Sequence, residues 1–202
     1  MSPAAYFGIA VIAFLAGSVP SGYLIALLFF RIDIRRRGSG NIGAMNALRT
    51  IGTGGALAVL VLDALKGLLP PLIVAAFIAI PPARALAALC AVLGHCFSPW
   101  LRGKGGKGVA TSFGALFALS WPAALCAVGG WLIGAGATTF SSVGSLLGSL
   151  IAIPAIWYFT RDGWLVGYAA CAAVLIFVTH RGNVARLLTG QESGISFLRR
   201  GA

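Results

Sequence analysis

The chain has 202 residues, of which 59% are hydrophobic and only 9% are charged, and its mean hydropathy is +0.95. This composition excludes an ordinary soluble domain and indicates a single integral-membrane domain over residues 1–202. The net charge of +11 comes from basic residues that cluster between apolar runs. We therefore expect membrane lipid headgroups or phosphorylated substrates as partners, and no nucleic acid.

The first three apolar segments are each close to the length of about 20 residues that a membrane span needs. The first covers residues 3–30, with Gly17, Pro20 and Gly22 as predicted bend or packing points. It has no basic leading region, so we expect a first transmembrane helix rather than a cleaved signal. The second and third are expected over residues 56–80 and 85–101, with a turn at residues 81–84.

Residues 108–160 form a run of 53 residues without one charge. As a single helix this run would be about 80 Å long, whereas the hydrocarbon core is about 30 Å thick. Three crossings fit better, with breaks predicted at residues 120–122 and 134–145. A turn at residues 161–163 then precedes the last expected span, residues 164–179, and a basic tail follows.

The distribution of basic residues predicts the orientation, because cytoplasmic loops are enriched in lysine and arginine. Twelve basic residues fall on the predicted inner side: Arg31, Arg35, Arg36, Arg37, Arg49, Arg102, Lys104, Lys107, Arg181, Arg186, Arg199 and Arg200. Two fall outside, Arg84 and Arg161. The sequence therefore predicts an all-α polytopic membrane protein with seven transmembrane helices, its N-terminus outside and its C-terminus cytoplasmic. Five spans with interfacial or re-entrant segments are the alternative.

The same topology brings four polar segments to the cytoplasmic face, including residues 138–145 with Ser142. Within the apolar run, the spacings Gly130/Gly134 and Gly144/Gly148 predict close helix packing. The four cysteines lie in apolar runs without CxxC spacing, so we expect small buried hydrophobes and no metal site or disulfide.

The first polar cluster occupies residues 35–49 and is basic and rich in glycine. Glycine turns let backbone N–H groups converge on an anion, and neighbouring side chains add donors. The predicted phosphate loop contains Gly38, Ser39, Gly40, Asn41, Gly43, Asn46 and Arg49. Residues 38–43 match G-x-G-x-x-G, but a membrane helix precedes them where a dinucleotide fold needs a strand. A flexible surface loop is the alternative.

The second cluster, residues 94–111, interleaves Lys104 and Lys107 with glycines at the start of an expected helix. It is not a Walker A loop, because Gly108 follows Lys107. A helix N-terminus favours phosphate, so we predict an anion cradle; simple anchoring by positive charge is the alternative.

The third cluster, residues 179–192, places His180, Asn183 and Arg186 three residues apart, on one face of a helix. His180 is the residue best suited to proton handling. A juxtamembrane helix with a capping histidine explains the pattern equally well. Inside the second span, Asp63 and Lys66 are expected to pair, either functionally or as a structural ion pair.

At these three clusters the sequence resembles the PlsY family, the acyl-phosphate:glycerol-3-phosphate acyltransferases of bacterial membranes. The matching residues are 38–46, 94–97 with 105–111, and 180–183 with Arg186 and Glu192. Their order and spacing agree with the family over nearly the whole chain. Met45 stands where the family usually has threonine, so position 45 is given no role. Trp100 and Arg102 also depart from the pattern, and Arg102 is interpreted as an anchor.

The resemblance implies transfer of a fatty acyl group from acyl phosphate to the 1-hydroxyl of glycerol 3-phosphate. The products would be lysophosphatidic acid and inorganic phosphate, in phospholipid biosynthesis. It also implies a bacterial cytoplasmic (inner) membrane location, with the active site facing the cytoplasm. An acyl phosphate is already activated, so no coenzyme A pocket, metal or cofactor is expected, and no obligatory protein partner is evident.

The resemblance and the residue chemistry together suggest individual roles. We expect catalytic roles for Ser39, Lys104, His180 and Asn183, with either His180 or a substrate phosphate as the base. Substrate binding is expected from Gly38, Gly40, Asn41, Asn46, Arg49, Gly105, Gly106, Lys107 and Ser142. The competing class is a transporter or channel for a phosphorylated or anionic solute. Such a protein would line its spans with polar groups, whereas here they concentrate in loops.

Overall fold

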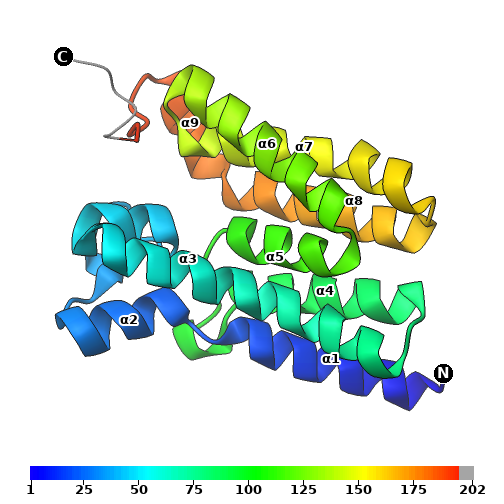
Figure 1. The fold of residues 1–202 in the computed structure, drawn as a ribbon. Coiled ribbons are helices and arrows are strands. Elements are labelled where there is room, and N and C mark those ends of the chain that lie inside the picture. Colours follow the sequence, from blue (N-terminus) through cyan, green and yellow to red (C-terminus); the bar gives the residue numbers. More distant parts are fainter. Residues whose placement is uncertain (196–202) are drawn as a thin grey trace.

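The structure of the protein is a computed structural model that describes residues 1–195, and its regular elements are helices (Figure 1). The α-helices in chain order are α1 (Pro3–Ser18), α2 (Ser21–Phe30), α3 (Ala44–Phe77), α4 (Pro81–Cys96), α5 (Val109–Leu119), α6 (Trp121–Thr138), α7 (Ser141–Thr160), α8 (Gly163–Thr179) and α9 (Arg181–Leu188). Two short 3-10 turns, η1 (Ile34–Arg36) and η2 (Pro99–Leu101), lie in the connecting loops. The chain is therefore all-helical over the described residues, as predicted.

The first apolar segment breaks between α1 and α2, at the predicted bend. Pro20 lacks an N–H group and cannot continue the hydrogen-bond ladder of α1. Gly17 lets α1 cross α4 with backbone contact, because a Cβ at Gly17 would overlap the carbonyl of Ala91. At the break the carbonyl of Val19 leaves the helical ladder and accepts from the N–H group of Ser21 (3.0 Å), which leaves room for a second donor.

Two predicted boundaries were wrong. The second span was expected to begin at residue 56, but α3 begins at Ala44 and continues through a non-helical residue, Gly52 (φ 79°). The turn expected at residues 81–84 is instead the start of α4, because Pro81 and Pro82 fit the first helical positions, where their missing N–H groups are not needed.

The uncharged run divides into three helices, α5, α6 and α7, with breaks at Ser120 and at Thr139–Phe140. Helix α5 has 11 residues and is therefore about 16 Å long, half of a hydrocarbon core. Among residues 1–195, five helical segments are long and apolar enough to span, or six if α8 and α9 form one bent span. The count of seven and the orientation of the termini stay predictions.

The interior is built from small side chains and the surface from large apolar ones. Alanines dominate the buried cluster between α4, α5, α6, α7 and α8. Phe7, Phe29 and Phe77 are 72, 78 and 84% exposed, as expected where lipid surrounds the protein. Cys126 and Cys171 also lie on exposed helix faces, so the expectation that all cysteines are buried was wrong. Their small, apolar side chains are compatible with a lipid-facing surface.

Helices α6 and α7 pack against each other through the predicted glycines. A Cβ at Gly134 would lie 2.9 Å from the Cα of Gly144, and a Cβ at Gly130 would lie 3.1 Å from the Cα of Gly148. Such close backbone approach favours helix association in lipid, where dispersion contacts drive packing.

This packing gives a testable prediction. Gly134→Ala is expected to destabilise the protein by about 1–3 kcal/mol, because the added methyl group meets the backbone of α7. The matched control is Gly136→Ala on the same helix, where a Cβ has open space; it should be neutral or slightly stabilising. Thermal unfolding in detergent measures both, and equal midpoints would contradict the close packing.

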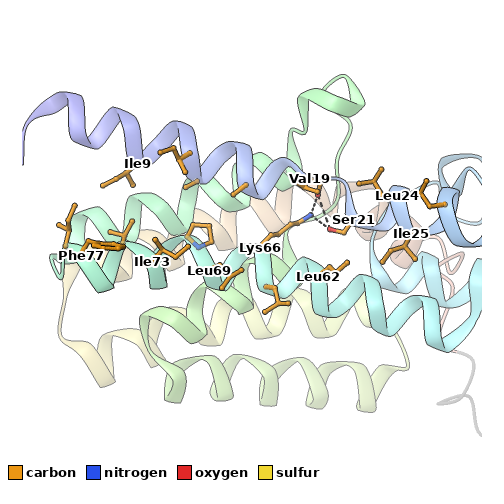
Figure 2. Close-up of a pocket in the computed structure, with 18 of the residues that line it drawn as sticks. Ile9, Val19, Ser21, Leu24, Ile25, Leu62, Lys66, Leu69, Ile73 and Phe77 are labelled. Atoms are coloured by element: carbon orange, nitrogen blue, oxygen red, sulfur yellow. Dashed lines mark hydrogen bonds between the residues drawn. The ribbon is translucent and has the colours of Figure 1, made fainter.

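A groove of about 840 Å³ lies between α1–α2 and α3 (Figure 2). Its walls are mainly leucine, isoleucine and phenylalanine side chains, and its polar lining residues are Ser21 and Lys66. The ammonium of Lys66 donates to the Val19 carbonyl (2.9 Å), and Ser21 lies beside it. The Val19 carbonyl at the α1–α2 break therefore accepts from a lysine of α3 in addition to the N–H group of Ser21.

Candidate active site

The predicted polar segments meet at one end of the molecule, where α2, α6 and α8 end and α3, α7 and α9 begin (Figure 1). Leu101 of η2 packs with Ile34 and Ile42, which joins the second loop to the first. The Thr179 hydroxyl donates to the carbonyl of Lys107 (2.9 Å). The N–H group of Ile195 donates to the carbonyl of Thr139 (2.8 Å). These contacts connect all four segments.

Glu192 lies at the centre of this meeting point and is buried. One of its carboxylate oxygens, Oε1, accepts from the Ser142 hydroxyl (2.9 Å) and the Asn183 amide (2.5 Å). The other, Oε2, accepts from Arg186 Nε (2.8 Å). Burial raises the pKa of Glu192, but the hydrogen bonds from Asn183, Ser142 and Arg186 outweigh it, so the net shift is downward. The carboxylate therefore stays ionised and acts as an acceptor only.

Asn183 connects Glu192 to Lys107. Its side-chain carbonyl accepts from Lys107 Nζ, and its amide donates to Glu192, so both neighbours fix the amide orientation. The side chain of Asn183 is thus engaged at both ends and contacts the Lys107 ammonium, and its expected catalytic role stays a prediction. Among residues 1–195, Asn183 provides the side-chain acceptor for this ammonium, which has three donors.

Lys107 lies in a strongly positive environment. Burial lowers its pKa to about 8; Glu192 opposes this shift, and Arg186 and Arg49 add to it. Helix α5 begins two residues later, so its free N–H groups also contribute positive potential. Three cations and a helix N-terminus oppose one carboxylate. This imbalance suits a doubly charged phosphate.

His180 lies at the α8–α9 junction and is 3% exposed. Its Nδ1 is 2.8 Å from the carbonyl of Ile176. A carbonyl only accepts, so Nδ1 carries the proton and Nε2 of the neutral ring is an acceptor. A nitrogen with this tautomer can take a proton from a substrate hydroxyl.

The first loop is held mainly by its own atoms. The Asn46 amide nitrogen donates to the carbonyls of residues 34, 37 and 41, while its oxygen accepts from the N–H group of Ser39. Asn46 therefore holds the loop together through these hydrogen bonds, and its expected part in substrate binding stays a prediction. The N–H group of Gly40 was expected to face an anion, but it donates to the carbonyl of Arg37.

Other predicted groups of the first loop have different positions. The Asn41 side chain accepts from the N–H group of Gly43 in a local turn. Gly38 adopts φ +56°, and a Cβ there would overlap the Asn46 side chain, so this glycine shapes the loop. The side chains of Ser39 and Arg49 are exposed at the surface of the site.

The second loop folds back on the end of α4. The N–H groups of Gly105 and Gly106 donate to the carbonyls of Cys96 and His95 (3.0 Å each). The N–H groups of these glycines thus satisfy the last carbonyls of α4, and the expected part of the two glycines in substrate binding stays a prediction. Lys104 is exposed and free of a side-chain partner among the described residues.

Glu192 is the central residue that the sequence-based site omitted. The sequence contained a signal, because the chain has only four acidic residues. Asp33 pairs with Arg35, Asp63 pairs with Lys66, and Asp162 caps α8. Glu192 is the remaining acid. It lies within the basic C-terminal segment, where a single carboxylate has several cations to bind.

Comparisons with known proteins show which family the chain belongs to. Residues 7–190 match the family described as glycerol-3-phosphate acyltransferase. A glycerol-3-phosphate acyltransferase from Synechococcus sp. is 43% identical over 188 residues, which is 90% of each chain. One from Rhodopseudomonas palustris is 44% identical over 190 residues, covering 94% of this chain and 96% of the relative.

Two solved structures are similar over nearly their whole length. The crystal structure of PlsY, an integral membrane glycerol 3-phosphate acyltransferase, in its glycerol 3-phosphate form superposes with a TM-score of 0.91 at 33% identity. That match covers 97% of this chain and 100% of the PlsY chain. The lysophosphatidic acid form gives a TM-score of 0.88 at 33% identity and covers 95% of each chain.

Proposed function

Because the chain belongs to the glycerol-3-phosphate acyltransferase family, an integral-membrane family of phospholipid biosynthesis, we propose that it transfers a fatty acyl group from acyl phosphate to the 1-hydroxyl of glycerol 3-phosphate. The products are lysophosphatidic acid and inorganic phosphate. The observation that carries the proposal is the cationic group around Lys107, whose charge also acts on the buried His180. The Nδ1 of His180 is bound to the Ile176 carbonyl, which leaves Nε2 as the acceptor of the neutral ring. We place the site at the cytoplasmic face of a bacterial inner membrane.

In this proposal Lys107 and Arg49 bind the phosphate of glycerol 3-phosphate. Asn183 holds the Lys107 ammonium, and Glu192 holds Asn183, so the cation is positioned before substrate arrives. Charge-assisted hydrogen bonds to phosphate are about twice as strong as neutral ones. A positioned cation also avoids reorganisation during binding.

The 1-hydroxyl oxygen attacks the acyl carbonyl carbon, and the carbon–oxygen bond to phosphate breaks as the ester forms. The proton of the hydroxyl passes to Nε2 of His180 or to a substrate phosphate. Lys104 and Ser39, both exposed at the site, offset the charge that develops on the departing phosphate. The donor is a mixed anhydride, so no covalent enzyme intermediate is required.

The lowered pKa of Lys107 predicts a pH dependence. Only the protonated ammonium carries the charge that binds phosphate, and only above about pH 7 is the phosphate of glycerol 3-phosphate doubly charged. The value of kcat/KM for glycerol 3-phosphate should therefore be level between about pH 7 and about pH 8. Above that range it should fall about tenfold per unit. Initial rates with uncatalysed donor hydrolysis subtracted measure the profile. Lys107→Arg stays charged and should remove the decrease in kcat/KM above about pH 8. If the decrease persists in this variant, a group other than Lys107 titrates.

The direct test measures inorganic phosphate released by purified, lipid-reconstituted protein from palmitoyl phosphate and glycerol 3-phosphate. Palmitoyl-coenzyme A serves as the parallel donor. Phosphate release that depends on glycerol 3-phosphate, without turnover of the thioester, is the expected result. Turnover of the thioester alone would overturn the donor. Silence with both donors in folded protein would favour transport of an anionic solute, which vesicle uptake of glycerol 3-phosphate then measures.

A further inference from the structure

His95 lies in the last turn of α4, is 4% exposed, and has no part in the proposed reaction. Its ring nevertheless touches the loop that carries Lys107. A Cβ built on Gly106 would overlap Nε2 of the imidazole, so the ring packs directly against this glycine. The N–H group of Gly106 also donates to the carbonyl of His95. Ring and backbone together hold the residue that precedes Lys107.

The opposite edge of the ring faces a carboxylate. His95 Nδ1 lies 3.7 Å from Oδ1 of Asp63, and it has no hydrogen-bond partner among residues 1–195. The same oxygen accepts from the Ser21 hydroxyl (3.0 Å) and pairs with Lys66 Nζ (2.8 Å). We call Ser21, Asp63, Lys66 and His95 the buried ion cluster. All four are buried within the helical bundle.

The α1–α2 break connects this cluster to the other end of the same loop. Lys66 Nζ donates to the carbonyl of Val19, as Figure 2 shows. Ser98, at the start of the loop, donates to the carbonyl of Ser18 (2.7 Å). Trp100 Nε1 donates to the Ser18 hydroxyl (2.8 Å). The loop from residue 97 to residue 108 is therefore held at its start by Ser18 of the break and at its other end by His95 of α4.

We propose that the buried ion cluster positions the Lys107 loop: Asp63 orients the ring of His95, and the ring sets the position of Gly106 and hence of Lys107. Charges inside membrane-spanning segments are costly and are kept where they serve a function. A purely structural pair needs only Asp63 and Lys66. It gives no reason for a histidine whose two ring edges face the carboxylate and the loop.

The experiment is a double-mutant cycle on the full-length protein, and its kinetic readout rests on the proposed function. Gly106→Ala pushes the loop from the ring, and His95→Ala removes the ring. Each should raise KM for glycerol 3-phosphate and lower kcat/KM about 10-fold to 100-fold, as a displacement of about 1 Å does. In the double variant the new methyl group fills space left by the ring. Its loss should be much smaller than the product of the single losses.

Lys66→Met tests the distant end of the cluster, with Arg84→Met as the matched control. Both substitutions remove a cation that donates to a backbone carbonyl. Arg84 lies near the start of α4 and donates to the carbonyl of Ala118 in α5, away from the loop. That site is about 16 Å along the helix from His95. Hydrogen exchange over residues 97–108 should quicken in His95→Ala and Lys66→Met and stay unchanged in Arg84→Met.

The outcomes separate the two proposals. An inactive wild-type protein would reject the proposed function, while hydrogen exchange would still test the positioning. Losses that multiply in the double variant, or folded His95→Ala protein with wild-type kcat/KM and exchange, would overturn the positioning role. If His95→Ala does not fold, His95→Gln keeps a side chain of similar reach and enters the same assays. If His95→Gln lowers turnover but leaves hydrogen exchange over residues 97–108 unchanged, the positioning role of His95 would also be rejected.

Discussion

Replacing Lys107 by methionine is expected to lower kcat/KM for glycerol 3-phosphate by about 100-fold to 1,000-fold, because removing one partner of a buried, hydrogen-bonded charge pair costs about 2–5 kcal/mol of binding. Methionine keeps most of the apolar stem but neither the charge nor the donors. Without the ammonium, Asn183 loses its donor and the phosphate loses the buried cation of the site. Steady-state kinetics in detergent micelles measure the loss, which should appear mainly in KM for the acceptor.

Arg102→Met is the matched control for Lys107→Met. It removes one positive charge from the same loop, but Arg102 is exposed and its role is interpreted as anchoring. Its kcat/KM should stay within about twofold of wild type, because exposed charges are screened. Equal losses in the two variants would show that general surface charge, and not the position of Lys107, attracts the substrate.

The apolar pattern predicted most of the fold. The break at Pro20, the division of residues 108–160 and the glycine contacts of α6 and α7 all follow from local chemistry. Boundaries failed where a polar sequence is helical. Residues 44–52 were not predicted to be helical, because they overlap the cluster of serine, asparagine and arginine residues at 35–49. In the structure Gly43 is the N-cap of α3 and the buried amide of Asn46 is hydrogen-bonded, so the helix begins there.

The sequence also predicted which loops meet, but not which atoms remain free. Glycine-rich segments were expected to offer N–H groups to an anion, whereas Gly40, Gly105 and Gly106 use them on nearby carbonyls. Sequence cannot show that satisfaction, because it depends on how the loop closes on α4. For the same reason the contact between His95 and Gly106 could not be predicted. These residues are eleven positions apart and are joined only by the fold.

Glu192→Gln should have the second large effect, on both stability and turnover. The carboxylate accepts from three donors, and a glutamine offers one oxygen and adds two donors of its own. At least one buried donor then loses its acceptor, at about 1–3 kcal/mol. Arg186 and Lys107 also lose the one carboxylate that opposes their charge. We expect a lower unfolding midpoint and a loss in kcat/KM of about 100-fold, because Asn183 no longer fixes Lys107.

Asp162→Asn makes the same chemical change at the other end of the molecule and is the control. Asp162 accepts from the N–H groups of Trp164 and Leu165 at the start of α8, and asparagine caps a helix equally well. Its midpoint and turnover should match wild type. Glu192→Gln with wild-type turnover would mean that Lys107 is positioned without the carboxylate, and the chain of contacts from Arg186 through Asn183 would not be part of catalysis. A lower midpoint with unchanged kcat/KM would leave Glu192 as a fold residue alone, because stability and phosphate binding would then have separate causes.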